Sequence, residues 1–153
     1  MTNYHLPVML DEVLEALDPA PGAVAIDGTL GNGGHAVEIA KRIGPTGVLV
    51  GIDRDPAMLE MGQKRLEKEL SMNAPTTHFF AMPFARAGEA LAQAGCRRGA
   101  DAALLDLGVN SLQLEEPARG FSFSKEGPLD ARYNQEEEGP TMAGLVNTAS
   151  VSD

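Results

Sequence analysis

A glycine-rich segment follows the first short apolar run of the chain and contains the residues best suited to hold a ligand. It reads Asp27-Gly28-Thr29-Leu30-Gly31-Asn32-Gly33-Gly34-His35. Its second half fits the dinucleotide-binding pattern G-x-G-x-x-G/A, and Asp53 lies about 20 residues beyond Gly33, near the spacing expected of a carboxylate that binds a ribose. The glycines alone are therefore compatible with a nicotinamide dinucleotide.

Asp27 changes the balance between the possible ligands. A carboxylate directly before the glycines would repel a pyrophosphate, but it suits a ligand with an ammonium and a sulfonium group, such as S-adenosylmethionine. The carboxylate of that cofactor could lie near the N-terminus of the following helix, where backbone N–H groups point outward. Asp27 thus favours a methyl donor over a nicotinamide, and a purely structural tight turn is the third interpretation.

Aspartates follow three of the four strands that we predict. Asp27 follows the first strand, Asp53 the second and Asp106 the fourth, whereas helix capping alone would account for one or two. Ligands of parallel sheets bind outside the carboxyl ends of the strands. We expect Asp53 to accept hydrogen bonds from both ribose hydroxyls, with an exposed loop acid as the alternative. We expect Asp106 to lie where the methyl group meets its acceptor, and the alternative is a contact with the cofactor alone.

Other side chains are weaker candidates. Phe84, after the third predicted strand, could offer an apolar face to adenine, and a core position is the alternative. We interpret His35 as lining the loop rather than carrying a proton. No metal site is predicted, because the neighbours of the acidic run at 136–138 supply no ligand spacing and a solvated surface segment explains it. The residues interpreted as structural or incidental are His5, His78 and Cys96.

An α/β framework is needed to bring these residues together. Apolar runs predict strands over residues 23–26, 47–52, 77–81 and 100–105, and helical periodicity predicts helices over about 7–17, 35–43, 56–70 and 85–94. Asp55 and Pro56 are typical of an N-cap and a first helical position. The alternation predicts a Rossmann-like fold with a doubly wound parallel sheet.

The last third of the chain has a different character. Residues 107–140 contain glycines, prolines and charges without a helical or strand period, and only residues 141–148 regain a helical pattern. We predict a long active-site loop over 107–140 within one cofactor-binding domain that spans residues 1–153, because a loop of this length in a compact domain is usually functional.

Composition limits the class of protein. The chain has 153 residues with 43% hydrophobic residues and one cysteine, which is typical of a globular α/β domain. No apolar stretch approaches the roughly 20 residues of a membrane span, and no cationic start precedes an apolar run, so we expect a cytoplasmic protein. The net charge of −10 is unusual for a protein that binds nucleic acid. A nucleic-acid substrate would need a local positive surface, or one on sequence outside this chain.

Five blocks, in the same order over nearly the whole chain, closely resemble the family of MraW-type enzymes, the ribosomal RNA small subunit methyltransferases H. The blocks are residues 5–12, 27–35, 51–56, 104–109, and 119–123 with 127–130. The resemblance implies the fold of S-adenosylmethionine-dependent methyltransferases, with S-adenosylmethionine as the donor. It also implies methylation of the N4 amine of a cytidine in 16S ribosomal RNA, and hence 16S rRNA or the small ribosomal subunit as the partner.

The resemblance also assigns residues by matching position. Gln113 enters on this ground alone. Separately, the chemistry of the amine leads us to expect that Asp106 accepts a hydrogen bond from its N–H, with the nearby Asn110 as a second catalytic candidate. The sequence departs from the family at residues 110–113, where Asn-Ser-Leu-Gln replaces the usual Ser-Ser-Pro-Gln. The cofactor contacts of the family fall on Gly33, Gly34, His35, Asp53, Phe84, Asp106 and Gln113.

Length leaves a second class of function open. Members of the family continue for about as many residues again, and that part supplies a substrate-recognition insert and the last strands of the sheet. The alternatives to an active methyltransferase are therefore a truncated, non-catalytic fragment that binds the cofactor and, with less support, an NAD-binding oxidoreductase domain.

Overall fold

The computed structural model describes residues 7–70 and 73–150. The chain forms two compact units, one up to Asp106 and one from Leu107 onward. The first unit contains the sheet and the glycine-rich segment, and each unit is described below by itself.

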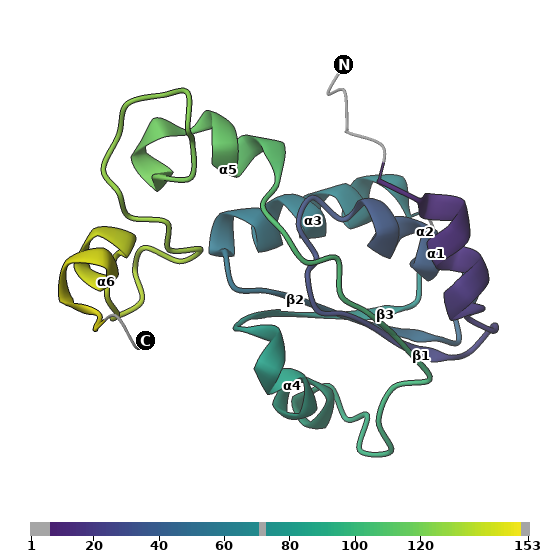
Figure 1. Cartoon of the computed structure of the whole chain (residues 1–153). Helices are drawn as coiled ribbons and strands as arrows, with labels where there is room; N and C mark the ends of the chain where they lie inside the picture. Colours follow the sequence, from purple (N-terminus) through teal and green to yellow (C-terminus); the bar gives the residue numbers. More distant parts are fainter. Residues whose placement is uncertain (1–6, 71–72, 151–153) are drawn as a thin grey trace. The chain divides into compact units, whose positions relative to one another are not determined.

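Four parallel strands form the sheet of the first unit, in the order β3-β2-β1-β4 (Figure 1). The predicted parallel α/β fold is therefore confirmed. From β1 the chain adds β2 and β3 on one side and then places β4 on the other side of β1. A ligand of an open parallel sheet is expected at such a switch point, here between β1 and β4. The strands are β1 (Val24–Asp27), β2 (Val48–Asp53), β3 (Thr76–Ala81) and β4 (Ala102–Leu104).

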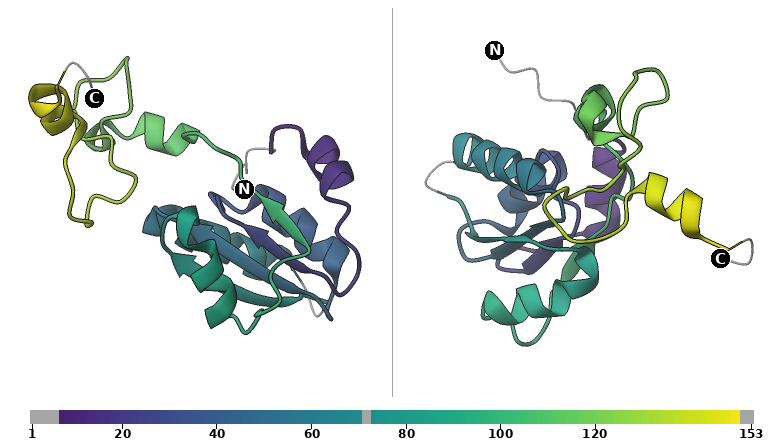
Figure 2. Two further views of the ribbon diagram at one scale, coloured as in Figure 1. Left: turned by 60° about the horizontal axis from the view of Figure 1, so that its bottom comes forward. Right: turned by 90° about the vertical axis from the view of Figure 1, so that its left-hand side faces the viewer.

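Helices cover both faces of this sheet (Figures 1 and 2). On one face lie α1 (Leu10–Leu17), α2 (Gly34–Ile43) and α3 (Pro56–Glu69). On the other face lies α4 (Ala87–Gln93), which a 3₁₀ turn, η1 (Phe84–Arg86), precedes. The predicted start of α3 is confirmed, because the carboxylate of Asp55 accepts a hydrogen bond from the Ala57 N–H at 3.1 Å and Pro56 is the first helical residue.

The residues of the two central strands, β1 and β2, are mostly apolar because helices bury both faces of these strands. Successive side chains of a strand point to opposite faces, so Leu49 packs with α2 and α3 while Val50 packs on the side of α4. Both residues are fully buried. The two cores hold the carboxyl ends of β1 and β2 in fixed positions, and the candidate site lies at these ends.

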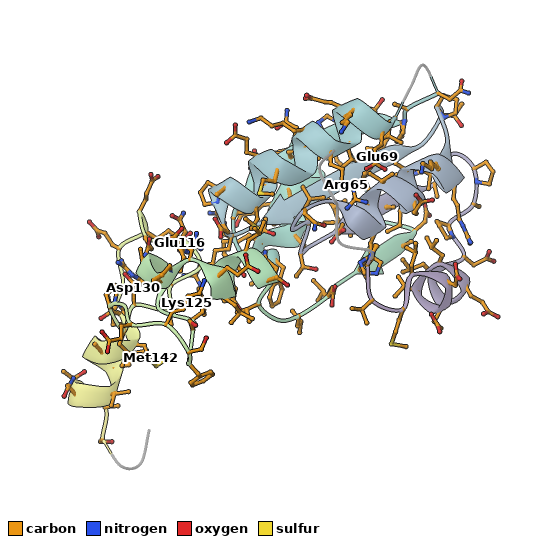
Figure 3. The ribbon with its side chains drawn as sticks, turned by 90° about the horizontal axis from the view of Figure 1, so that it is seen from above. Arg65, Glu69, Glu116, Lys125, Asp130 and Met142 are labelled. Carbon is orange, nitrogen blue, oxygen red and sulfur yellow. The ribbon has the colours of Figure 1, made fainter. Side chains whose placement is uncertain are left out.

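In the second unit, residues 107–140 contain two short regular elements that the sequence pattern did not predict, the helix α5 (Ser111–Glu115) and the 3₁₀ turn η2 (Pro117–Arg119). The helical pattern of residues 141–148 is confirmed as α6 (Met142–Thr148). Backbone contacts close this unit: the Met142 N–H donates to the carbonyl of Asp130 at 2.8 Å, and both residues are labelled in Figure 3. Within the described ranges, no helix is both long and apolar enough to cross a membrane.

Candidate functional site

The glycine loop joins β1 to α2 and lies directly against α3. Gly33 has a φ of 77°, which an L side chain rarely adopts. A Cβ atom at Gly33 would lie 2.9 Å from Leu66 Cδ1 and 3.0 Å from the carbonyl oxygen of Gly62. Glycine is therefore required at this position, because a side chain would collide with α3.

Gly28 brings an apolar surface next to the loop. A Cβ at Gly28 would lie 2.6 Å from Leu105 Cδ2 and 3.1 Å from Phe84 Cβ. Phe84 is 44% exposed and Leu105 is 50% exposed. The alternative interpretation of Phe84 as a core residue does not fit this exposure, and its ring is available to a flat apolar group beside the loop.

Asp27 is a buried carboxylic acid at the end of β1. Burial raises its pKa to about 7, and the neighbouring charges of Asp53 and Asp106 act in the same direction. A hydrogen bond from the Thr29 N–H to Asp27 Oδ1, at 3.1 Å, opposes the increase. Ionising Asp27 is thus unfavourable in the free protein, and a bound cation near the end of β1 would make it favourable.

Asp53 braces the loop from the end of β2. Its Oδ2 accepts a hydrogen bond from the Gly31 N–H at 2.8 Å, and its Oδ1 accepts one from the Asp55 N–H at 2.9 Å. Each carboxylate oxygen has two acceptor positions. The side chain can consequently hold the loop and still accept hydrogen bonds from ligand hydroxyls.

His35 and Asp106 lie side by side at the beginning of α2 and beyond the end of β4. His35 Nε2 is 3.1 Å from the carbonyl oxygen of Val8. Because a carbonyl only accepts, this contact places a proton on Nε2. Nδ1 then faces Asp106 Oδ2 at 3.8 Å, a distance that exceeds that of a hydrogen bond.

Arg65 of α3 supports the glycine loop through a contact with Asn32. This role was not predicted from the sequence. Its Nη1 donates to Asn32 Oδ1 at 3.4 Å, and the same oxygen accepts from the Gly34 N–H at 3.3 Å. Arg65 is buried and pairs with Glu69 at 2.8 Å, as Figure 3 shows along one side of α3. The spacing of Arg65 and Glu69 was a signal for the helical pair, but nothing local indicated that the guanidinium reaches Asn32.

The predicted site residues fall into two groups. Gly33, Gly34, His35, Asp53, Phe84 and Asp106 all lie at the carboxyl ends of the strands in the first unit. Asn110 and Gln113 lie in the second unit. There, Asn110 Oδ1 accepts from the Gln113 N–H at 2.9 Å and Gln113 Oε1 accepts from the Asn110 N–H at 3.1 Å, so the pair caps α5. Their roles toward a ligand stay predictions.

Among the residues interpreted as incidental, His78 lies half-buried within β3 and Cys96 is half-buried after α4. His5 lies outside the described residues, as does the first part of the block 5–12. A hollow lined by residues 17–23 and 101–102 is found at the amino ends of β1 and β4. That end of a parallel sheet is not where its ligands bind, so we assign the hollow no ligand.

Comparisons with known proteins point to one family. The sequence profile of the MraW methylase family matches residues 2–153. A ribosomal RNA small subunit methyltransferase H of Nitratidesulfovibrio vulgaris is 45% identical over 97% of this chain and 40% of its own length. The protein of that name in Geobacter sulfurreducens is 47% identical over 96% of this chain and 45% of its own. The chain thus spans less than half the length of these curated relatives.

Solved structures resemble the chain more distantly. An RNA methyltransferase from Salinibacter ruber, in complex with S-adenosyl-L-homocysteine, is 20% identical and covers 54% of this chain and 52% of its own, with a TM-score of 0.44. A SAM-dependent O-methyltransferase from Thermotoga maritima is 17% identical and covers 56% of this chain and 32% of its own, with a TM-score of 0.45.

Proposed function

We propose, since the chain belongs to the MraW methylase family, that the glycine loop of its first unit binds S-adenosylmethionine. We propose further that the longer proteins of this type methylate the N4 amine of a cytidine in 16S ribosomal RNA, in the cytoplasm. The observation that carries the first proposal is the buried Asp27, with the carboxylates of Asp53 and Asp106 near it, beside the glycine loop at the carboxyl ends of the strands. This negative site suits a cationic ligand and would repel a pyrophosphate.

Each residue at the carboxyl ends of the strands has a proposed task toward the cofactor. Asp53 accepts hydrogen bonds from the ribose hydroxyls, and the exposed ring of Phe84 packs on adenine. Gly33, Gly34 and His35 present the start of α2 to the carboxylate of the cofactor, where the positive end of the helix dipole favours an anion. Gln113 is a further contact by its resemblance to the family pattern.

S-adenosylmethionine supplies an electrophilic methyl group on a sulfonium. The N4 amine of cytosine is a weak nucleophile because its lone pair is delocalised into the ring, so the protein must hold the amine in line and accept a hydrogen bond from its N–H. Asp106 is the proposed acceptor, with Asn110 as a second candidate. The base would have to leave its stack to reach Asp106.

Binding is tested first, on this chain. Calorimetric titrations with S-adenosylmethionine, S-adenosylhomocysteine and NAD should give heat with the first two and none with NAD. Asp27→Asn should weaken S-adenosylmethionine by roughly tenfold, the size of one charge-assisted contact. Asp11→Asn, which changes an exposed aspartate of α1, is the matched control and should leave the affinity unchanged. Binding of NAD alone would instead support a nicotinamide-dependent oxidoreductase.

Methyl transfer is tested separately, because the chain spans 40–45% of the length of the relatives it matches. Small ribosomal subunits lacking the modification are incubated with this chain or with the full-length Geobacter sulfurreducens relative, and the 16S RNA is analysed by mass spectrometry. We expect a methylated cytidine with the relative, and a large loss when its counterpart of Asp106 becomes Ala. Cofactor binding without product by this chain would identify it as a non-catalytic fragment.

A further inference from the structure

Thr29 continues the contact between β1 and β4 beyond the point where the two strands stop pairing. The last backbone bond runs from the Gly28 N–H to the carbonyl of Leu104, at 2.9 Å. The next donor along the β4 segment is the Asp106 N–H, and it bonds to Thr29 Oγ1 at 2.7 Å. A side-chain hydroxyl thus accepts where a continued ladder would use a backbone carbonyl.

Asp27 fixes the orientation of Thr29. The Thr29 N–H donates to Asp27 Oδ1 at 3.1 Å, which forms an Asx turn. Because the Asp106 N–H can only donate, Thr29 Oγ1 accepts that bond, and its own proton points to Asp27 Oδ1 at 3.5 Å. The contacts therefore run in one direction, from Asp106 through Thr29 to the buried carboxyl group.

Asp106 needs such support because packing does little to hold it. It lies two residues beyond the end of β4, its side chain is 61% exposed, and the preceding Leu105 is 50% exposed. Its carboxylate lies 3.8 Å from His35 Nδ1, which is too far for a hydrogen bond. The 2.7 Å hydrogen bond from the Asp106 N–H to Thr29 Oγ1 therefore restrains the Asp106 backbone.

We propose that Thr29 is a positioning residue that holds Asp106 beside His35 at the mouth of the glycine loop, through the hydrogen bond between its hydroxyl and the Asp106 N–H. Its consequence for ligand affinity rests on the function proposed above. The groups that face Asp27 are the carboxylates of Asp53 and Asp106, and His35 lies beside Asp106. A change in the charge of Asp27 near neutral pH is passed to the Asp106 N–H through Thr29.

The test compares Thr29→Val, which keeps the shape without the hydroxyl, with Thr29→Ser, which keeps the hydroxyl. Nuclear magnetic resonance of the ¹⁵N-labelled chain follows the Asp106 amide, and calorimetry measures affinity for S-adenosylhomocysteine. In Thr29→Val the amide proton should move upfield and the affinity should fall about fivefold, the effect of one hydrogen bond. Thr29→Ser should restore both values. Thr29→Ala serves as the second variant if the valine is poorly accommodated.

A pH titration separates positioning from a general structural effect. In the native chain, the Asp106 amide shift should follow the ionisation of Asp27 near pH 7, and this component should be absent from both Thr29→Val and Asp27→Asn. An Asp106 amide that is the same in Thr29→Val and the native chain would overturn the proposal. If the native chain fails to bind S-adenosylhomocysteine, the proposed function fails, while the amide comparison still decides the role of Thr29.

Discussion

Replacing Asp27 by Asn should stabilise the free protein at neutral pH and above, although it weakens the binding of a cationic ligand. Asp27 is 2% exposed, and its carboxyl group faces the charges of Asp53 and Asp106. An Asn side chain has nearly the same shape and keeps an oxygen that can accept the Thr29 N–H. It carries no charge, so the cost of ionising a buried acid disappears.

The size and the sign follow from the pKa of Asp27, which rises from 3.8 to about 7 in the folded protein. A shift of about 3 pKa units corresponds to roughly 4 kcal/mol. The folded state holds its proton more tightly than the unfolded state, so the stability contributed by protonated Asp27 is complete below about pH 4 and is lost as the pH rises to about 7. The Asp27→Asn variant has no ionisable group at this position and suffers no such loss. The difference in the free energy of unfolding between the variant and the native chain should therefore grow over this pH range and level off above it.

The assay is urea unfolding, followed by far-ultraviolet circular dichroism, at about pH 5.5 and about pH 8. The free energy of unfolding of Asp27→Asn minus that of the native chain should increase by about 2 kcal/mol between the two conditions. Asp11→Asn, on the exposed side of α1, should show no comparable increase. An equal difference at both pH values would refute the argument that Asp27 is protonated in the free protein near neutrality.

Three further substitutions test other parts of the site. Gly33→Ala should lower the free energy of unfolding by about 1–3 kcal/mol in the same urea assay, because the φ of 77° and the contact with α3 exclude a Cβ; a neutral effect would contradict that geometry. Asp53→Asn should weaken S-adenosylmethionine about tenfold by calorimetry and also cost about 1–3 kcal/mol of stability, because one amide oxygen cannot accept from both the Gly31 and the Asp55 N–H groups as the carboxylate does. Phe84→Ala should change stability by less than about 1 kcal/mol, since the ring is 44% exposed, yet weaken S-adenosylhomocysteine severalfold; unchanged affinity would argue against the adenine contact.

Local sequence signals predicted the sheet and most of the first unit well. The two central strands are short apolar runs, and Asp55-Pro56 marks the start of α3. The helix predicted from residue 7 instead begins at Leu10, because Met9 adopts a left-handed conformation with a φ of 54°. Such a conformation depends on what packs around it and leaves no pattern in the sequence.

The site was predicted in its residue types and only partly in its contacts. The rule that ligands bind at the carboxyl ends of strands singled out Asp27, Asp53 and Asp106. It could not reveal that Asp53 also supports the glycine loop, or that Arg65 reaches Asn32, because these contacts join residues 22 and 33 positions apart. In contrast, Asn110 and Gln113 have the spacing of a capping box. This local pattern is a sequence signal for the start of α5.

The backbone of the glycine loop approaches the backbone of α3 closely at Gly62. A Cβ at Gly62 would lie 2.8 Å from the carbonyl oxygen of Gly31, and one at Gly33 would lie 3.1 Å from Gly62 Cα. At these close approaches the loop and the helix have little room to move independently. The loop is thus ordered before any ligand arrives, so ligand binding loses little conformational entropy in shaping it. Gly62 of α3 would contribute to ligand affinity in this way.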